Sequence, residues 1–241
     1  MSAPAVDNTA AAPSASALAT LDLFALGRQA SAARDARLGR HGTFARARQL
    51  LGDGTWRGPR DAADSQVDEA DVAALGGLTA ARAAGADLLI ASSADAAQAA
   101  AAAGLRVLLK VPFAAGENDA ERLVRLAALA DAPLWGMLPA PVGEPYGLDT
   151  VRCFALCRLA LPAVPHLVAD VAALGPRLAQ MAFGFGADAL LAPIVAERAL
   201  RLGVNANNPA LTRKEAATLI RGAGLVPCER LADSSLQEVP A

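Results

Sequence analysis

A regular alternation of short apolar segments with helical segments begins near Gly77 and constrains the fold more than any other feature of the sequence. Each predicted strand is continuously apolar, as expected of parallel strands covered on both faces. The predicted strands span residues 87–91, 106–113, 134–139, 166–172 and 187–191. The helices predicted between them span residues 93–103, 118–130, 148–161 and 176–185. Right-handed crossovers then give an α/β fold, which is either an open doubly wound sheet or a partial barrel.

The segment before this alternation is less regular. Leucine and phenylalanine at helical spacing predict one helix over residues 17–38, with arginines on its opposite face. Residues 43–51 are compatible with a strand. Residues 52–66 contain Gly, Pro, Asp and Ser with little hydrophobic period, which predicts a loop.

Three polar residues are candidates for helix caps. Asn118 and Asp149 stand at the beginnings of predicted helices, and Thr212 precedes a helix predicted over residues 213–222. Residues 225–231 then return as a final extended segment. The chain after Gly77 is therefore expected to keep the strand and helix alternation almost to its end.

Length and composition indicate one domain. The chain has 241 residues, of which 54% are hydrophobic, and this suffices for one large core. Only nine residues are aromatic, so the core is expected to consist mainly of Leu, Val and Ala. Residues 1–16 are rich in Ala, Ser and Pro and predict a disordered tail, which leaves residues 17–241 as the single domain.

Charge, hydropathy and cysteine usage exclude several classes of protein. The formal net charge of -2 lacks the basic excess typical of a nucleic-acid binder. No apolar stretch is long enough for a membrane span, and the first residues do not resemble a signal peptide, so a cytoplasmic protein is expected. Three cysteines, an odd number without framework spacing, fit free thiols in a reducing compartment.

The segment from Leu148 to Arg230 carries a resemblance to a known family. It contains LDTVRCFALCRLALPAVPHLVADVAALGPRLAQMAFGFGADALLAPIVAERALRLG, followed by ALTRKEAATLIRGAGLVPCER. In the order and spacing of its segments it resembles the C-terminal part of aminofutalosine synthase and of cyclic dehypoxanthinyl futalosine synthase. Both are radical-SAM enzymes of menaquinone synthesis by the futalosine pathway.

Two segments nearer the N-terminus extend the resemblance. LGRQA and HGTFARARQL, the second beginning at His41, are similar to the family's N-terminal helix and first strand. About two-thirds of the chain takes part, and the family is usually longer. The resemblance implies a truncated or partial (β/α) TIM-type barrel of the radical-SAM kind.

The signature of the family's chemistry is missing from the place where the resemblance puts it. Radical-SAM enzymes hold a 4Fe-4S cluster with three cysteines spaced C-x3-C-x2-C, and the fourth iron binds S-adenosylmethionine. The matching region after the first strand, residues 49–56, contains no cysteine. Cys153 and Cys157 lie on a predicted helix, where they are expected to be small buried hydrophobic residues, and Cys228 is distant. We therefore expect no cofactor and no metal.

A few polar residues remain as candidates for ligand binding. Lys110, Asp170 and Asp188 stand at ends of predicted strands, where parallel sheets and barrels bind ligands, although a structural ion pair or an exposed sheet edge is an alternative for Lys110. Glu197 matches an acidic position of the family, with a solvated helix residue as the alternative. His166 is expected to have a hydrogen-bonded packing role.

Three hypotheses about function follow. The first is a radical-SAM-like pseudoenzyme that acts as an auxiliary or regulatory component of menaquinone synthesis, with a pathway enzyme or a small-molecule intermediate as partner. The alternative is a non-radical enzyme that uses acid-base residues at the strand ends. A third is a non-functional remnant, which the intact alternation after Gly77 disfavours. No catalytic residue is assigned.

Overall fold

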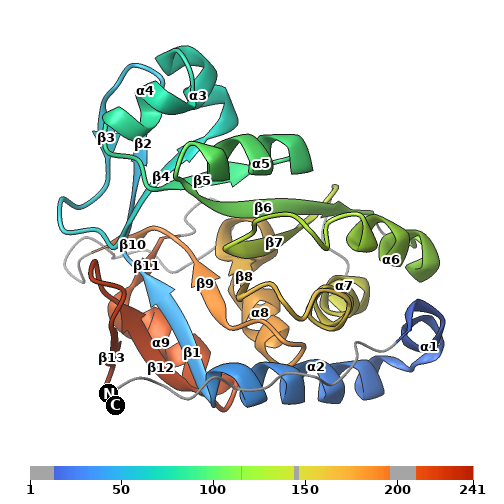
Figure 1. The fold of residues 1–241 in the computed structure, drawn as a ribbon. Helices are drawn as coiled ribbons and strands as arrows, with labels where there is room; N and C mark the ends of the chain where they lie inside the picture. The colour runs from blue at the N-terminus through green and yellow to red at the C-terminus, as the bar shows by residue number, and fades with distance from the viewer. Residues whose placement is uncertain (1–13, 115, 144–146, 196–209, 241) are drawn as a thin grey trace, which may run out of the picture.

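The computed structural model describes residues 14–114, 116–143, 147–195 and 210–240, and Figure 1 shows their arrangement. Its dominant feature is a curled, mostly parallel sheet with the strand order β13-β12-β1-β9-β8-β7-β6-β5-β4-β2-β3. The strands of this sheet are β1 (His41–Ala45), β2 (Ala47–Leu50), β3 (Trp56–Arg57), β4 (Asp64–Asp68), β5 (Leu88–Ala91), β6 (Arg106–Phe113), β7 (Gly136–Pro141), β8 (His166–Asp170), β9 (Ala189–Leu191), β12 (Val226–Arg230) and β13 (Leu236–Glu238). A separate parallel pair is formed by β10 (Ile194–Val195) and β11 (Leu211–Thr212).

The sheet curls because β1 and β2 follow each other directly in the chain but lie near opposite edges of the sheet. Only Arg46 separates β1 from β2, yet β1 pairs with β9 and β12, whereas β2 pairs with β4 and β3. The Arg46 carbonyl also accepts a hydrogen bond from Ala63 N, at 2.8 Å, just before β4. The prediction of a partial barrel is therefore confirmed, and the open doubly wound sheet is excluded.

Helices cover the outer surface of this curled sheet (Figure 1). They are α1 (Ala15–Thr20), α2 (Leu23–Leu38), α3 (Glu69–Leu75), α4 (Leu78–Ala83), α5 (Ala94–Ala102), α6 (Asp119–Ala127), α7 (Gly147–Ala160), α8 (Val171–Phe183) and α9 (Arg213–Gly222). The predicted caps at Asn118 and Thr212 are confirmed, and Thr212 forms a reciprocal capping box with Glu215. Within the described residues, no helix has the length and apolar character needed to cross a membrane.

Apolar side chains form two cores, as expected of a barrel with helices around it. The larger core lies between the sheet and the helices and includes the fully buried Phe44, Phe154 and Phe183. The smaller core fills the barrel interior with Leu88, Leu108, Leu138, Val168 and Ala189. Because this inner core is built from aliphatic residues, it separates the two ends of the barrel and leaves the polar chemistry to those ends.

The N-terminal half departs from the predictions in two places. The single helix predicted over residues 17–38 is two helices, because Asp22 caps α2 by accepting a hydrogen bond from Ala25 N at 2.8 Å. The predicted loop over residues 52–66 contains β3 and the beginning of β4. Strand β4 was missed because Asp64 and Ser65 are buried polar residues, which hide the hydrophobic period.

Three smaller expectations also need correction. Asp149 lies inside the first turn of α7, where its carboxylate accepts a hydrogen bond from Gly116 N at 2.9 Å. The helix predicted from residue 176 begins at Val171, with non-helical backbone at Gly175. Of the predicted tail, residues 1–13 lie outside the described residues, while Ala15 already belongs to α1.

Candidate functional site

The C-terminal ends of the barrel strands form a polar mouth. Leu108 and Val168 belong to the inner core, so Lys110 and Asp170, two residues further along β6 and β8, face the same side of the sheet. Asp64 lines the barrel interior, and Asp68 shares its side of β4. Three ionisable side chains from three strands are therefore directed toward one mouth, at the end where (β/α) barrels carry their sites.

The charges at this mouth act on one another. Burial raises the pKa of Asp170, and its hydrogen bonds with the backbone of α8 and the charge of Lys110 oppose that rise only in part. Burial likewise raises the pKa of Asp68, again opposed by Lys110, while the charges of Asp71 and Glu69 raise it further. The charge of Lys110 lowers the pKa of both carboxyl groups, and we call Lys110, Asp68 and Asp170 the mouth cluster; among the described residues, no ion pair or side-chain hydrogen bond joins Lys110 to either carboxylate.

One acceptor atom in this cluster is left unsatisfied. The Oδ2 atom of Asp68 accepts a hydrogen bond from Gln49 Nε2 at 2.9 Å. Its Oδ1 atom is buried, and among the described residues it has no hydrogen-bond partner. A buried acceptor without a donor costs free energy and needs a specific explanation, such as a bound water, ion or ligand; Thr150 Oγ1 on α7 is a second such atom among the described residues.

The rim of the mouth is fixed by the junction of β4 and α3. The Asp71 carboxylate accepts a hydrogen bond from Gly52 N at 2.9 Å, which holds the chain just after β2. The Glu69 carboxylate accepts hydrogen bonds from Ser92 N at 2.7 Å and from Ser92 Oγ at 2.6 Å, just after β5. These carboxylates position the ends of β2 and β5, and Asp68 is the last residue of β4, the strand between them.

A tight turn follows β2. Leu51 N donates to the Thr55 carbonyl at 2.9 Å, and Gly54 N donates to the Leu51 carbonyl at 2.9 Å. The Asp53 carboxylate accepts from Thr55 N at 2.9 Å, and the chain then reverses into the antiparallel strand β3. The connection after the first barrel strand is therefore closed by its own hydrogen bonds.

The three cysteines lie away from this turn. Cys153 and Cys157 are buried one helical turn apart on α7, as predicted, and Cys228 is buried on β12. A hydrogen bond with Cys153 and burial raise the pKa of the Cys157 thiol. Burial also raises the pKa of Cys228. All three thus behave as small apolar residues of the core.

The opposite, N-terminal end of the barrel holds a second polar cluster, in which Asp188 is the central acceptor. Its buried carboxylate accepts hydrogen bonds from Arg158 Nη2 at 2.5 Å, from Leu167 N at 2.6 Å and from the ring of His166 at 2.7 Å. Burial lowers the pKa of the Arg158 guanidinium, and the charge of Asp188 opposes this. The predicted hydrogen-bonded role of His166 is confirmed.

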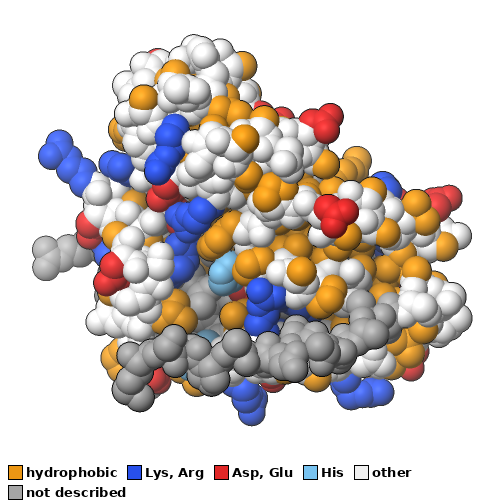
Figure 2. All heavy atoms as spheres, in the orientation of Figure 1, with side chains coloured by type: hydrophobic (Ala, Val, Ile, Leu, Met, Phe, Trp, Pro, Cys, Tyr) orange, Lys and Arg blue, Asp and Glu red, His pale blue; other side chains and the backbone are white. Residues whose placement is uncertain are grey.

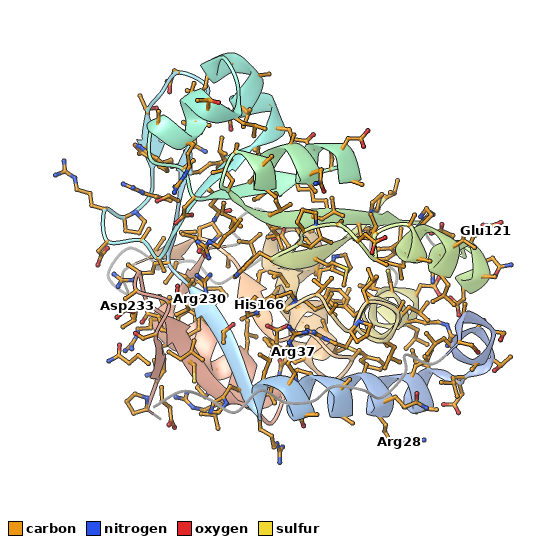
Figure 3. The ribbon with its side chains drawn as sticks, viewed as in Figure 1. Arg28, Arg37, Glu121, His166, Arg230 and Asp233 are labelled. Atoms are coloured by element: carbon orange, nitrogen blue, oxygen red, sulfur yellow. The ribbon has the colours of Figure 1, made fainter. Side chains whose placement is uncertain are left out.

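Trp135 connects this cluster to a group of arginines. Its ring lies 4.6 Å from the ring of His166, and the guanidiniums of Arg106 and Arg230 lie 5.1 and 5.0 Å from its centroid. Both arginines also bind the buried carboxylate of Asp64. Figure 2 shows basic side chains gathered around a hollow on this face, and Figure 3 labels His166 and Arg230 there. We call the residues Asp64, Arg106, Trp135, Arg158, His166, Asp188 and Arg230 the N-terminal plug.

The predicted site residues are therefore divided between the two ends. Lys110 and Asp170 face the mouth from β6 and β8, whereas Asp188 stands just before β9 at the plug. Glu197 lies outside the described residues. Asp68 was not predicted as a site residue. If β4 had been predicted, the position of Asp68 at its end, before the acidic first turn of α3, would have indicated it.

Comparison with known proteins supports the resemblance in part. No protein-family model matches the chain. Aminodeoxyfutalosine synthase of Thermus thermophilus is 34% identical over 93 residues, which are 39% of this chain and 24% of that enzyme. The match thus spans about a quarter of the relative's length and shows a distant, partial similarity.

Solved structures show the fold. Methylornithine synthase (PylB) superposes with a TM-score of 0.61 at 14% identity, covering 88% of this chain and 92% of that one. The FeFe-hydrogenase maturase HydG from Carboxydothermus hydrogenoformans gives a TM-score of 0.58 at 11% identity, covering 88% and 74% of the two chains. The chain therefore has the radical-SAM-like (β/α) half-barrel fold, with a distant relation to aminofutalosine synthase.

The residues of this chain do not fit the 4Fe-4S cluster that the fold family implies. A cubane with an open iron needs three thiolates brought together on one loop. The turn at residues 51–55 contains no cysteine, and Asp71 holds Gly52 from outside it. The thiols of the chain belong to α7 and β12, where they are buried in packing.

Proposed function

We propose that this protein is a radical-SAM-like barrel without cluster-dependent catalysis, which acts as an auxiliary or regulatory component of menaquinone synthesis. The observation that carries the proposal is the hydrogen-bonded turn at residues 51–55, which stands where a cluster-binding loop would follow the first strand. The rest of the barrel is retained, and its mouth keeps polar side chains for a ligand. A fold retained without its usual reaction is suited to binding.

Anaerobic reconstitution with iron and sulfide tests this proposal. We expect less than stoichiometric iron, no visible absorption typical of a cubane, and no release of 5'-deoxyadenosine from S-adenosylmethionine under reducing conditions. Aminodeoxyfutalosine synthase of Thermus thermophilus, treated in parallel, serves as the positive control. Four irons per chain together with 5'-deoxyadenosine release would overturn the proposal.

The partner is tested separately. We propose a menaquinone-pathway enzyme or a small-molecule intermediate of that pathway as the partner, on the strength of the partial similarity to aminodeoxyfutalosine synthase. Affinity capture of the tagged protein from its native cells, followed by mass spectrometry, should enrich a quinone-pathway protein over a tag-only control. If none is enriched and no pathway intermediate binds the purified protein, the partner proposal fails.

A second candidate function is that of a non-radical enzyme with acid-base residues at the mouth. What supports it is that Lys110, Asp68 and Asp170 face the same end of the barrel and that burial raises the pKa of both carboxyl groups, but no hydrogen bond or ion pair joins the three among the described residues, and this weakens the candidate. Perturbed ionisable groups directed at one mouth are typical of catalytic sites. Asp188 has no part in this candidate, because it is bound at the other end of the barrel.

A further inference from the structure

A small cavity lies inside the barrel beside the N-terminal plug. Its volume is about 20 Å³, and a single water molecule needs about 10–15 Å³, so the cavity holds one small chemical group. Part of its wall belongs to the apolar inner core and consists of Leu88, Leu108, Val168 and Ala189. Asp64, Trp135 and Arg230 of the plug also line it. An apolar cavity with charged side chains in its wall suits a ligand that has a short hydrocarbon part and a polar head.

Two arginines at this cavity keep N–H groups that the fold does not use. Arg230 donates to the Asp64 carboxylate through Nη1 and Nη2, and Arg106 donates to it through Nη2 at 2.8 Å. Among the described residues, Nε of Arg230 and both Nε and Nη1 of Arg106 have no hydrogen-bond partner. These three nitrogen atoms are not buried, so a ligand can reach them.

The charges at this place suit one anionic group. Arg106 and Arg230 carry two positive charges, and the Asp64 carboxylate that both bind carries one negative charge. Asp87 lies 3.1 Å from Arg106, but its side chain is 37% exposed, so water screens this second pair. The Trp135 ring lies 5.1 and 5.0 Å from the two guanidiniums and helps to fix their positions. Two fixed guanidiniums favour a carboxylate over a neutral polar group.

We propose that the N-terminal plug binds a small monocarboxylate, whose carboxylate accepts hydrogen bonds from Arg230 and Arg106 and whose hydrocarbon part enters the cavity beside Trp135. The volume of the cavity limits that hydrocarbon part to about the size of the one in propionate. Figure 3 shows Arg230 on the side of the molecule where the ligand would enter. The site lies at the end of the barrel opposite the mouth, so this inference goes beyond the functions proposed above and does not depend on them.

Tryptophan fluorescence of the full-length Trp56→Phe protein tests the proposal. The chain has two tryptophans, so Trp135 is then the single reporter, and Trp56 lies on β3, outside the cavity wall. Sodium propionate is titrated at neutral pH and constant ionic strength, with propionamide as the neutral control and pivalate as a bulkier carboxylate. We expect a saturable change with propionate in the millimolar range, none with propionamide, and about tenfold weaker binding of pivalate.

Three arginine variants, made in the same Trp56→Phe background, show which guanidiniums hold the carboxylate. Arg106→Gln removes one positive charge and two unused donors, and it should weaken propionate binding by about tenfold or more. Arg230→Lys keeps the positive charge but loses the forked donor, and it should also weaken binding. Arg82→Gln is the matched control, because Arg82 is exposed on α4 and does not line the cavity. Circular dichroism checks that each variant is folded.

The proposal is overturned by any of three results. These are no saturable change with propionate, an equal response to propionamide, and full affinity for propionate in both Arg106→Gln and Arg230→Lys. Each of them leaves the cluster-free proposal standing, because iron incorporation tests that separately.

Discussion

The two ends of this barrel use buried charge in opposite ways. At the N-terminal plug, the Asp188 carboxylate receives three hydrogen bonds and Asp64 binds two arginines. At the mouth, an oxygen of Asp68 has no partner among the described residues, and burial raises the pKa of both Asp68 and Asp170. Satisfied charges hold a fold together, whereas unsatisfied ones lower its stability and are retained where function needs them.

Removing Asp188 is expected to have the largest effect on stability. Asp188→Ala leaves the buried Arg158 guanidinium without its partner, and breaking a buried pair from one side costs about 3–5 kcal/mol. Urea unfolding measures the change, with Asp188→Asn as a milder variant that keeps one oxygen acceptor. If the free energy of unfolding falls by less than about 1 kcal/mol in both variants, the charges of the N-terminal plug do not stabilise the fold as argued.

Asp64→Asn should destabilise the protein by about 1.5–3 kcal/mol at neutral pH, the range for hydrogen bonds to charged groups. Burial alone would raise the pKa of Asp64, but hydrogen bonds and charge from Arg230 and Arg106 lower it overall. The stability that the ionised Asp64 contributes is therefore present above its unfolded pKa near 3.8. It is lost as the pH falls through the lower pKa of the folded state. The variant and the parent should converge in thermal stability under acid conditions.

Asp68→Asn should change stability in the opposite direction. Because the folded pKa of Asp68 is raised, its charge opposes folding at neutral pH, and the variant should gain up to about 1 kcal/mol, or about 2–4 °C in Tm. The gain should fade as pH falls through the raised pKa toward 3.8, where the parent carboxyl becomes protonated. A loss of stability at neutral pH would show that Asp68 belongs to the structural framework.

Lys110→Ala is expected to have the smallest effect. The side chain is exposed, so the free energy of unfolding should change by less than about 0.5 kcal/mol. Lys214→Ala, a change at an exposed residue of α9, is the matched control, and urea unfolding should show a similarly small change for both variants.

The sequence predicted the elements that are apolar and regular. Strand β6 was predicted at its observed bounds, and the Thr212 cap was predicted as observed, because both depend on local spacing. Strand β4 was missed because its residues Asp64 and Ser65 are buried in a polar network contributed by distant strands.

The site was predicted only in part for a related reason. Asp170 follows an apolar run and is the last residue of β8, so its place at the C-terminal end could be read from the sequence, whereas Lys110 is the fifth of the eight residues of β6. Asp188 stands before β9, and this places it at the opposite end. The contacts among Trp135, His166 and Arg230 join three separate parts of the chain, and no local pattern reveals them.

Electron paramagnetic resonance of the anaerobically reconstituted, dithionite-reduced protein, with and without S-adenosylmethionine, tests the central claim most directly. A barrel whose turn after the first strand, residues 51–55, is hydrogen-bonded and contains no cysteine should give no reduced-cubane signal in either sample. A stoichiometric cubane signal that changes when S-adenosylmethionine is added would contradict the claim.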